Sequence, residues 1–376
     1  MVQIVQLDTS KRRDARRFVQ FVFDLYRDHP YWVPPVYSDA IKQVSPQHNP
    51  YFDHSEAEFF LAMQGSEVVG RIAVLDNHNY RNHHHKQDGF FYLFDTVDDQ
   101  EVADALYGAA FEWCRARELT RIIGPKGFVV FEGYGMLQHG FDKLPAMGIP
   151  YNYDYYCRLT EAVGMEKEVD FNSYYISIPD FHLPERMARL SDKIQKRRGL
   201  RVCNFRTMAE VRRIVPEIVE TYNSTFVENW EYVPVTAREA DAVAGQMLQV
   251  TRPELLKVIV NRDGQIVGFL LAFINVGRAL QRCRGRLFPF GWFHLLREMG
   301  RTDLLDVNGM GILEEYRGLG GNIVMYSELH KSLHSGQFVH ADMTQMADLV
   351  VNMLADANTL GGSRYKVHRV YRKALD

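Results

Sequence analysis

The sequence predicts an α+β protein made of two similar halves in tandem. The segment 67–74 (EVVGRIAV) resembles the segment 265–272 (QIVGFLLA) at an offset of 198 residues. Two strand-like runs, Val2–Gln6 and Leu200–Asn204, have the same offset. Two strand signals at one offset indicate a duplicated fold. Because only two copies are present, we expect a tandem of complete domains and not a solenoid.

The first half is expected to alternate strands and helices. Apolar residues at helical spacing predict a helix over 14–27, and a proline-rich loop follows at 30–35. The turn residues Gln64-Gly65-Ser66 predict a hairpin between strands at 59–63 and 68–75. The remaining elements expected here are a strand at 90–94, a helix at 100–117, a strand at 121–124, a helix through Tyr155–Leu159 and a strand at 171–178.

The second half repeats the scheme. The Asp263-Gly264 pair predicts a tight hairpin between strands at 256–260 and 266–274. The other elements expected here are a strand at 200–205, a helix at 208–226, a strand at 304–312, a helix at 323–333, a strand at 339–343, a helix through Asn352 and a strand at 366–372. We therefore divide the chain into an N-terminal domain (1–180), a linker helix (181–199) and a C-terminal domain (200–376).

Composition is that of a globular enzyme. The net charge of −3 argues against a dedicated nucleic-acid binder. No apolar run reaches the roughly 18 residues that a membrane span needs, and no apolar signal region is present at the N-terminus. The cysteines lack metal-ligand spacing and are expected to be reduced thiols of a cytoplasmic protein; they are Cys114, Cys157, Cys203 and Cys283.

The most informative stretch is 313–322 (LEEYRGLGGN), between the predicted strand 304–312 and helix 323–333. Glycines let the backbone approach a phosphate closely, and the unpaired N–H groups of a helix start supply donors and partial positive charge. The stretch therefore predicts a cradle for a pyrophosphate. The alternative is an ordinary glycine-rich helix entry that binds nothing.

This stretch resembles the signature of the GNAT superfamily of acyl-CoA-dependent N-acyltransferases, in which a strand, a Gln/Arg-x-x-Gly-x-Gly/Ala loop and a helix follow one another. Arg317 and Gly320 match the first and fourth positions, and Asn322 departs from the last. The tandem layout is similar to a little-characterised bacterial group of double-GNAT proteins. The resemblance implies, in each half, a mixed, mostly antiparallel sheet flanked by helices.

The resemblance also implies acetyl-CoA, or another acyl-CoA, as co-substrate. The positions implied to bind it are Gly311, Ile312, Leu313, Arg317, Gly318, Leu319, Gly320, Gly321, Asn322 and Asn352. In this superfamily a deprotonated amine attacks the thioester directly, so no nucleophilic triad is expected. Asp306 is the candidate base, and a strand-end carboxylate is the alternative. The tyrosine that often follows the last-helix asparagine in the family is missing after Asn352.

The acceptor loop implied by the resemblance is 226–236. Trp230 and Tyr232 would form an apolar wall, and Glu228 and Glu231 would hold a cationic amine. The alternative is a loop pinned by its aromatic residues, with Thr236 capping the next helix. The acceptor itself is expected to be the amine of a small molecule or a peptide.

The two halves differ at the loop. Where the second half has glycines, the first has Asp95, Asp98, Asp99 and Glu101, which suit a helix N-terminus and would repel a pyrophosphate. We therefore expect acyl-CoA to bind the second half. Two other functions stay open: a non-catalytic acyl-CoA or ligand-binding protein, and a peptidyl-type transferase that uses aminoacyl-tRNA.

Two remaining features have alternative interpretations. Arginines at 278, 282, 284 and 286 precede the aromatic run 288–293; together they would touch an anionic membrane surface, the CoA 3′-phosphate or an acidic acceptor. The alternative is that the aromatics pack on the first half. The run His83-His84-His85 is expected to be a surface loop without a functional metal site.

Overall fold

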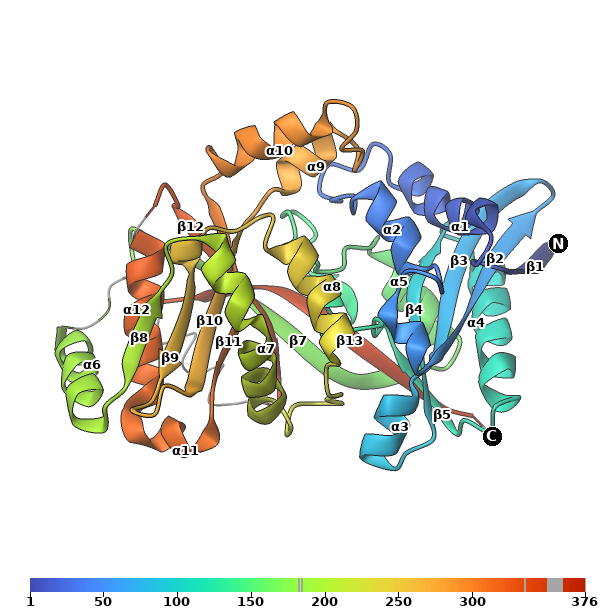
Figure 1. Cartoon of the computed structure of the whole chain (residues 1–376). Helices are drawn as coiled ribbons and strands as arrows, with labels where there is room; N and C mark the ends of the chain where they lie inside the picture. Colours follow the sequence, from blue (N-terminus) through green and yellow to red (C-terminus); the bar gives the residue numbers. More distant parts are fainter. Residues whose placement is uncertain (182, 184, 335, 350–360, 376) are drawn as a thin grey trace.

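The strands of both halves form one continuous sheet in the computed structural model, which describes residues 1–181, 183, 185–334, 336–349 and 361–375 (Figure 1). Most neighbouring strands are antiparallel, whereas β4–β5 and β11–β12 are parallel. From edge to edge the described strands are β1 (Val2–Leu7), β2 (Glu56–Gln64), β3 (Glu67–Asp76), β4 (Asp88–Thr96), β5 (Arg121–Gly124), β13 (Ser363–Ala374), β7 (Glu166–Ser177), β12 (His340–Ala347), β11 (Leu304–Ile312), β10 (Ile266–Ile274), β9 (Leu256–Val260) and β8 (Arg201–Asn204), and β6 (Met136–His139) pairs with β13.

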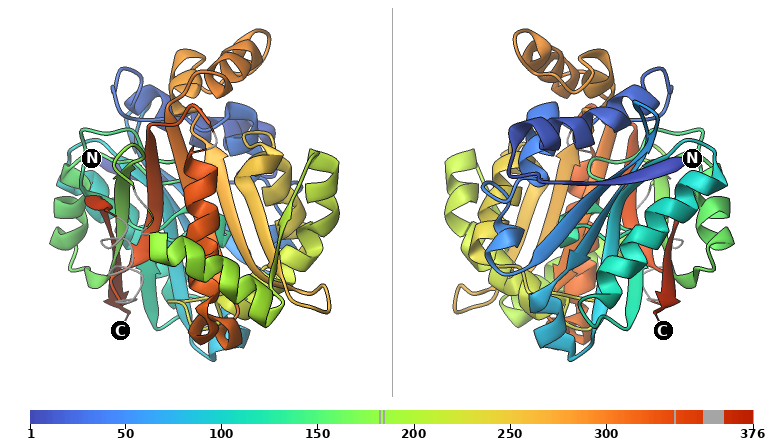
Figure 2. Two further views of the ribbon diagram at one scale, coloured as in Figure 1. Left: turned by 90° about the vertical axis from the view of Figure 1, so that its left-hand side faces the viewer. Right: turned by 90° about the vertical axis from the view of Figure 1, so that its right-hand side faces the viewer.

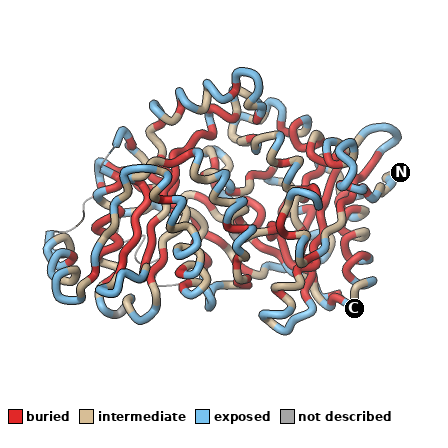
Figure 3. The backbone as a smooth tube through the Cα atoms, viewed as in Figure 1, coloured by how far each residue is buried: buried red, intermediate tan, exposed pale blue. Residues whose placement is uncertain are grey.

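Helices flank the sheet, and the buried residues concentrate in the strands between them (Figure 3). The helices of the first half are α1 (Arg12–Leu25), α2 (Tyr37–Gln43), α3 (His78–His84), α4 (Gln100–Arg115) and α5 (Tyr155–Ala162). Those that follow are α6 (Glu185–Arg198), α7 (Met208–Thr225), α8 (Ala237–Met247), α9 (Gly277–Arg282), α10 (Gly291–Met299), α11 (Glu314–Tyr316) and α12 (Asn322–His334). The α+β class expected from the sequence is confirmed.

Neighbouring residues of β10 show how the two faces of the sheet are covered. Leu270 belongs to the apolar cluster that contains Leu329 of α12. Phe269 belongs to a separate cluster that contains Tyr222 of α7. Because successive side chains of a strand point to opposite faces, α12 and α7 pack on opposite sides of the second half's sheet.

The internal repeat is visible in three dimensions. A Cβ at Gly70 of β3 would stand 2.8 Å from Leu106 of α4, and a Cβ at Gly268 of β10 would stand 3.1 Å from Met325 of α12. Each glycine therefore lets the helix of its half approach the third strand in that half. The helix that follows each parallel-paired strand thus packs in the same way in both halves.

The last strand of each half completes the sheet of the other half. We expected β7 to close the first half and β13 to close the second. Instead, β13 pairs with β5 along Tyr371–Ala374, and β7 pairs with β12 along Phe171–Ser177. The two exchanged strands also pair with each other and lie across the middle of the molecule (Figure 1). The domain limits at 180 and 200 remain a proposal, and the exchange means that neither range contains a closed sheet.

Helix α6 lies within the range 181–199, for which a linker helix was expected. Helix α6 ends before Gly199, whose positive φ of 69° suits a helix C-terminus. The helix packs against α12 at one end of the molecule (Figure 2). In the described part of the chain, no helix combines the length and apolarity needed to cross a membrane.

Candidate active site

The parallel strands β11 and β12 separate partway along their length. They pair only along Leu304–Val307 and His340–Met343. Beyond that point β11 follows β10 to Ile312 past a bulge, while β12 follows β7. In the described strand pairings, the β12-facing edge of residues 308–312 therefore has no partner strand. Such an edge offers backbone donors and acceptors to an extended ligand.

The predicted positions for the pantetheine arm lie on this segment. Gly311 is buried, and a Cβ there would stand 2.9 Å from the Thr225 methyl group at the end of α7. Ile312 is buried as well. The Leu313 N–H donates to the Val267 carbonyl oxygen at 2.9 Å, so this donor is already used. Gly311 pairs with Phe269 and faces β10 as Leu313 does, since alternate residues of a strand address the same neighbour. The geometry thus leaves the Ile312 N–H of this segment for a ligand.

The glycine loop follows β11 directly, as the motif predicts. Gly320 has φ +88° inside an otherwise helical turn, which strains any residue with a side chain. The side on which its Cβ would stand is occupied by Ile194 of α6, whose Cδ1 is 2.4 Å away. A Cβ at Gly321 would stand 2.0 Å from Ile312 Cδ1. Close packing by α6 is therefore one reason for glycine at position 320. The predicted approach of a phosphate is a second reason.

Arg317 fastens the loop to its surroundings. Its Nε donates to the Ile312 carbonyl oxygen at 3.0 Å, and its Nη2 donates to the Thr225 carbonyl oxygen at 2.9 Å. The guanidinium thus ties the loop to the ends of β11 and α7. For the Arg317 side chain to bind a phosphate, it would have to give up these two hydrogen bonds.

A basic groove lies beside the loop. It has a volume of about 500 Å³ and is lined by Arg186, Met187, Arg189, Leu190, Lys193 and Ile323. Its three cationic side chains belong to exposed residues of α6, and Ile323 belongs to the first turn of α12. Positive charge therefore gathers beside the helix start where the pyrophosphate is predicted to bind.

Asp306, the predicted base, lies on β11 just before the strands separate. It is fully buried. Its Oδ2 accepts from the Met147 N–H at 2.9 Å, and both of its oxygens accept from the Asn275 amide at 3.0 Å. Burial, and then the charge of Asp342, raise the pKa of Asp306 to about 8.

Asp342 on β12 is the register partner of Asp306 and was not predicted from the sequence. Burial raises its pKa to about 7. One of its oxygens accepts a short hydrogen bond from the Tyr365 hydroxyl, and its Oδ1 has no protein partner. Two buried carboxyls that face each other on neighbouring strands cannot both ionise readily. Near neutral pH the pair therefore holds at least one proton.

Tyr365 connects this pair to the surface. It is half-buried at the start of β13, and its ring centroid lies 5.5 Å from that of Tyr175. The next residue, Lys366, is buried and donates to the carbonyl oxygens of Gly140 and Lys143 at 2.6 and 2.7 Å. A strand contributed by the exchange therefore brings a tyrosine to the carboxyl pair and fixes the loop that covers it.

The predicted acceptor loop docks on the first half. Trp230 is half-buried, and its ring centroid lies 5.6 Å from Phe171 and 5.8 Å from Tyr134. The Tyr232 hydroxyl donates within its own half to Asn223. Glu228 is exposed. The aromatic residues therefore take part in packing, while Glu228 remains accessible to a cationic ligand.

Neighbouring residues support the pinned-loop interpretation. Thr236 caps α8 through a reciprocal pair of hydrogen bonds with Glu239, as that interpretation predicts. Glu231 is buried and lies 3.3 Å from Lys86 Nζ and 3.6 Å from an Arg121 nitrogen. His84, expected in a surface loop, instead ends α3 and contacts the Tyr232 carbonyl oxygen at 2.6 Å. The histidine run was mispredicted because its contact with a distant segment is not visible in the sequence.

In the first half, the region that corresponds to the glycine loop is occupied by carboxylates with partners of their own. Asp95 is buried and paired with Arg71 at 2.7 Å. Asp99 caps α4 by accepting from the Glu101 N–H. Asp98 pairs with Arg158. The predicted helix-capping role is thus present for Asp99, whereas Asp95 and Asp98 pair with arginines.

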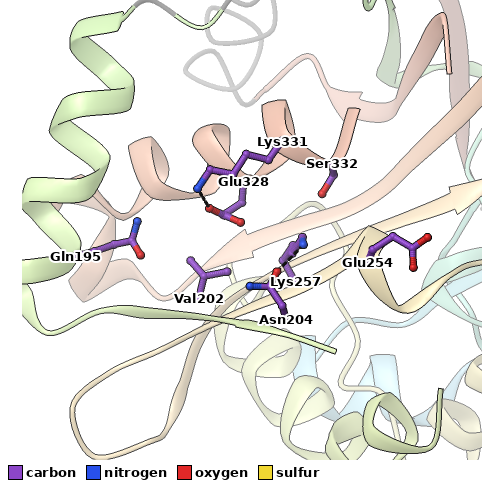
Figure 4. Close-up of a pocket in the computed structure, with 8 residues that line it drawn as sticks. All are labelled: Gln195, Val202, Asn204, Glu254, Lys257, Glu328, Lys331 and Ser332. Atoms are coloured by element: carbon purple, nitrogen blue, oxygen red, sulfur yellow. Dashed lines mark hydrogen bonds and ion pairs between the residues drawn. The ribbon is translucent and has the colours of Figure 1, made fainter. Parts of the chain in front are cut away.

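The predicted position Asn352 lies outside the described residues, so the structure does not test it. A second pocket, of about 340 Å³, opens between α6, α12, β8 and β9, and none of its lining residues is a predicted site residue (Figure 4). The pocket is lined by Gln195, Val202, Asn204, Glu254, Lys257, Glu328, Lys331 and Ser332.

Comparisons with known proteins agree with this arrangement. No family model matches the sequence. The chain is 27% identical over 370 residues to Protein YghO of Escherichia coli (strain K12), covering 97% of this chain and 94% of that protein. It is 28% identical over 372 residues to a bacterial ceramide synthase of Caulobacter vibrioides, covering 96% of this chain and 95% of that protein.

A solved structure covers the whole molecule. It is a tandem GNAT protein from the clavulanic acid biosynthesis pathway, with a TM-score of 0.58 and 12% identity, and the match covers 100% of this chain and 99% of that chain. At this identity the similarity shows a shared fold. The chain therefore has the tandem GNAT fold.

Proposed function

We propose that the chain is an acyl-CoA-dependent N-acyltransferase. The observation that carries the proposal is the separation of β11 from β12, which leads directly into the glycine loop and the start of α12. An open strand edge next to a helix N-terminus suits a ligand with an amide-containing arm and a pyrophosphate. The tandem GNAT fold agrees with this function.

The acyl-CoA would lie along the second half. The Ile312 N–H would donate to the pantetheine arm, and the N–H groups of the loop up to Asn322 would hold the pyrophosphate. The basic groove on α6 would attract the anionic nucleotide end. The first half would bind no acyl-CoA, because Asp95, Asp98 and Asp99 occupy the corresponding region.

The reaction would be a direct acyl transfer. The nitrogen of a neutral primary amine attacks the thioester carbonyl carbon, a C–N bond forms, and the C–S bond breaks. The amine loses one proton, and the CoA thiolate takes up one proton. The products are an amide and free CoA.

The buried carboxyl pair supplies a suitable base. A catalytic base works best when its pKa lies near the working pH, and the pKa of Asp306 is raised to about 8. We assign proton uptake to the Asp306–Asp342 pair. Because Tyr365 donates to Asp342 and is half-buried, we assign to it the passage of a proton between the pair and the site.

We further propose a long-chain amine as acceptor, in place of a small molecule or peptide. The support is the 28% identity to a bacterial ceramide synthase along 96% of this chain. A ceramide is a long-chain amino alcohol whose nitrogen carries a fatty acyl group. The acyl donor would then be a long-chain acyl-CoA, with acetyl-CoA as the simpler alternative.

The test is turnover by the full chain. Acetyl-CoA and palmitoyl-CoA are each incubated with a sphingoid base, a polyamine and a peptide amine, and amides are measured by mass spectrometry. Product mass is preferable to thiol titration because the chain has its own free cysteines. We expect an N-acyl sphingoid base. Acyl-CoA binding without an amide from any amine would indicate a binding protein, and activity only with charged tRNA would indicate a peptidyl-type transferase.

A further inference from the structure

The segment between β10 and β11 carries an apolar surface that points away from the protein. Its bulky side chains are among the most exposed apolar ones described: Phe288 is 90% exposed, Phe290 76%, Leu296 60%, and Trp292 and Phe293 53% each. The alternative that these aromatics pack on the first half is therefore wrong. The exposed apolar side chains gather on α10 and the short run before it.

Helix α10 is apolar on both of its faces. Leu295 and Met299 face inward and pack against the core cluster of the second half. Trp292, Phe293 and Leu296 lie at the intervening helical positions and are exposed. The outward side of α10 is thus an exposed apolar patch of the kind that marks an interaction site.

The base of the segment is anchored on both halves. Gln281 donates to the carbonyl oxygens of Pro30 and Trp32 at 2.9 and 3.0 Å. The Arg286 guanidinium lies 4.3 Å from the centre of the Tyr37 ring. Helices α9 and α10 therefore form a supported projection, which stands out from the rest of the molecule in both views of Figure 2. The exposed aromatic side chains therefore belong to a helical projection that is held in place by these contacts.

The charge of this projection is opposite to that of the rest of the chain. Residues 277–301 contain six arginines and one glutamate, a formal net charge of +5, whereas the whole chain has −3. The glutamate, Glu298, is buried and paired with Arg282 at 3.0 Å. Arg284, Arg297 and Arg301 are exposed. A second copy of the chain, meeting the first through this surface, would bring two such positive charges together.

We propose that α10 and residues 288–290 dock the protein on an anionic phospholipid bilayer. Aromatic and leucine side chains beside arginines are the combination that inserts at the lipid headgroup boundary. The arginines would contact lipid phosphates while Phe288, Phe290, Trp292, Phe293 and Leu296 enter the acyl boundary. The proposal concerns a surface separate from Asp306 and the glycine loop, and it stands whether or not the chain acylates a lipid amine.

The test is flotation of the full chain with vesicles. One set contains phosphatidylglycerol and phosphatidylcholine, and the other contains phosphatidylcholine alone. We expect binding to the anionic vesicles that weakens as salt rises. The triple variant Trp292→Ser, Phe293→Ser, Leu296→Ser should keep the wild-type melting temperature, because its side chains are exposed, and should lower the partition coefficient roughly tenfold or more.

Leu190→Ser provides the matched control. Leu190 is 42% exposed and lies among the basic side chains of α6, so it has the same character on another surface. This variant should bind vesicles like the wild type. Absence of wild-type binding, or equal binding by the triple variant, would overturn the proposal. So would a wild-type dimer that the triple variant converts to monomers without any change in vesicle binding, measured by sedimentation.

Discussion

Asp306 and Asp342 face each other at the same register of two parallel strands, and both are buried where those strands separate. The charge of one carboxylate raises the cost of ionising the other. Tyr365 contacts this pair from a strand at the far end of the chain. The last three described strands in the sequence, β11, β12 and β13, therefore converge at the place where the proposed thioester chemistry would occur.

The first prediction concerns the pair as a base. Asp306→Asn should lower kcat at least about a hundredfold, because the variant cannot take up the amine proton. In the wild type, kcat/KM should rise with pH through the region near pH 8, where Asp306 loses its proton. The profile is measured with two acceptors of different amine pKa. A rising limb that shifts with the amine, and not with the enzyme, would contradict the assignment.

The second prediction concerns stability. An unfolded aspartate has a pKa of about 3.9, whereas burial raises the folded pKa of Asp306 to about 8. Between these values the folded state binds the additional proton, so the free energy of unfolding should fall as pH rises, by at most about 1.4 kcal/mol per pH unit. Urea denaturation from pH 5 to 8 should show a steeper loss for the wild type than for Asp306→Asn. Parallel curves would count against a buried, protonated Asp306.

The third prediction separates two reasons for the glycine at position 320. Gly320→Val should weaken CoA binding at least about a hundredfold, roughly 3 kcal/mol, if the loop wraps a pyrophosphate. Because Ile194 occupies the same space, Ile194→Ala is the control: it should lower the melting temperature and leave CoA affinity nearly unchanged. Calorimetry on the double variant completes the test. Recovery of wild-type affinity there would mean that Gly320 serves only the packing of α6.

The fourth prediction is a stoichiometry. Calorimetry on the full chain should give one acyl-CoA per chain, because Asp95, Asp98 and Asp99 occupy the corresponding region of the first half. Gly320→Val should remove that single binding event. Two sites, or half of the heat remaining in the variant, would show that the first half binds acyl-CoA.

The fifth prediction concerns the acceptor loop. Trp230→Ala should lower the free energy of unfolding by about 2 kcal/mol, less than a fully buried tryptophan, because the ring packs between the halves while remaining half-buried. Glu228→Gln should leave stability unchanged and raise KM for a cationic amine. Unfolding curves and acceptor titrations distinguish these roles. An unchanged KM for every amine would remove Glu228 from the acceptor site.

Local patterns were sufficient for most of the fold. The runs 256–260, 266–274 and 304–312 are strands with the predicted limits, because apolar and β-branched residues between turn signals determine a strand locally. The hairpin glycines Gly65 and Gly264 have the positive φ that their turns require. The exchange of β7 and β13 was not predicted. The apolar pattern of each strand would allow it to pair in either half, so the pattern does not select the partner.

The candidate site was only partly accessible from sequence. The glycine loop is recognisable because its function depends on consecutive residues. Asp306 could be proposed from its place on the predicted strand. Asp342 and Tyr365 could not, because they meet only where β12 and β13 both pair with β7, a strand of the first half. The contact between Ile194 and Gly320 could not be predicted either, because it also depends on how two distant segments pack together.

The exchanged strands also affect how the chain reaches its native state. On a ribosome, residues 1–180 emerge long before 363–374, so β5 lacks its β13 neighbour until both halves have been synthesised. The central part of the sheet must therefore assemble after translation of both halves, and the first half must present an open strand edge in the meantime. Cutting the gene between the halves would separate each sheet from the strand that closes it. We therefore expect the two sequence repeats to unfold together as one unit.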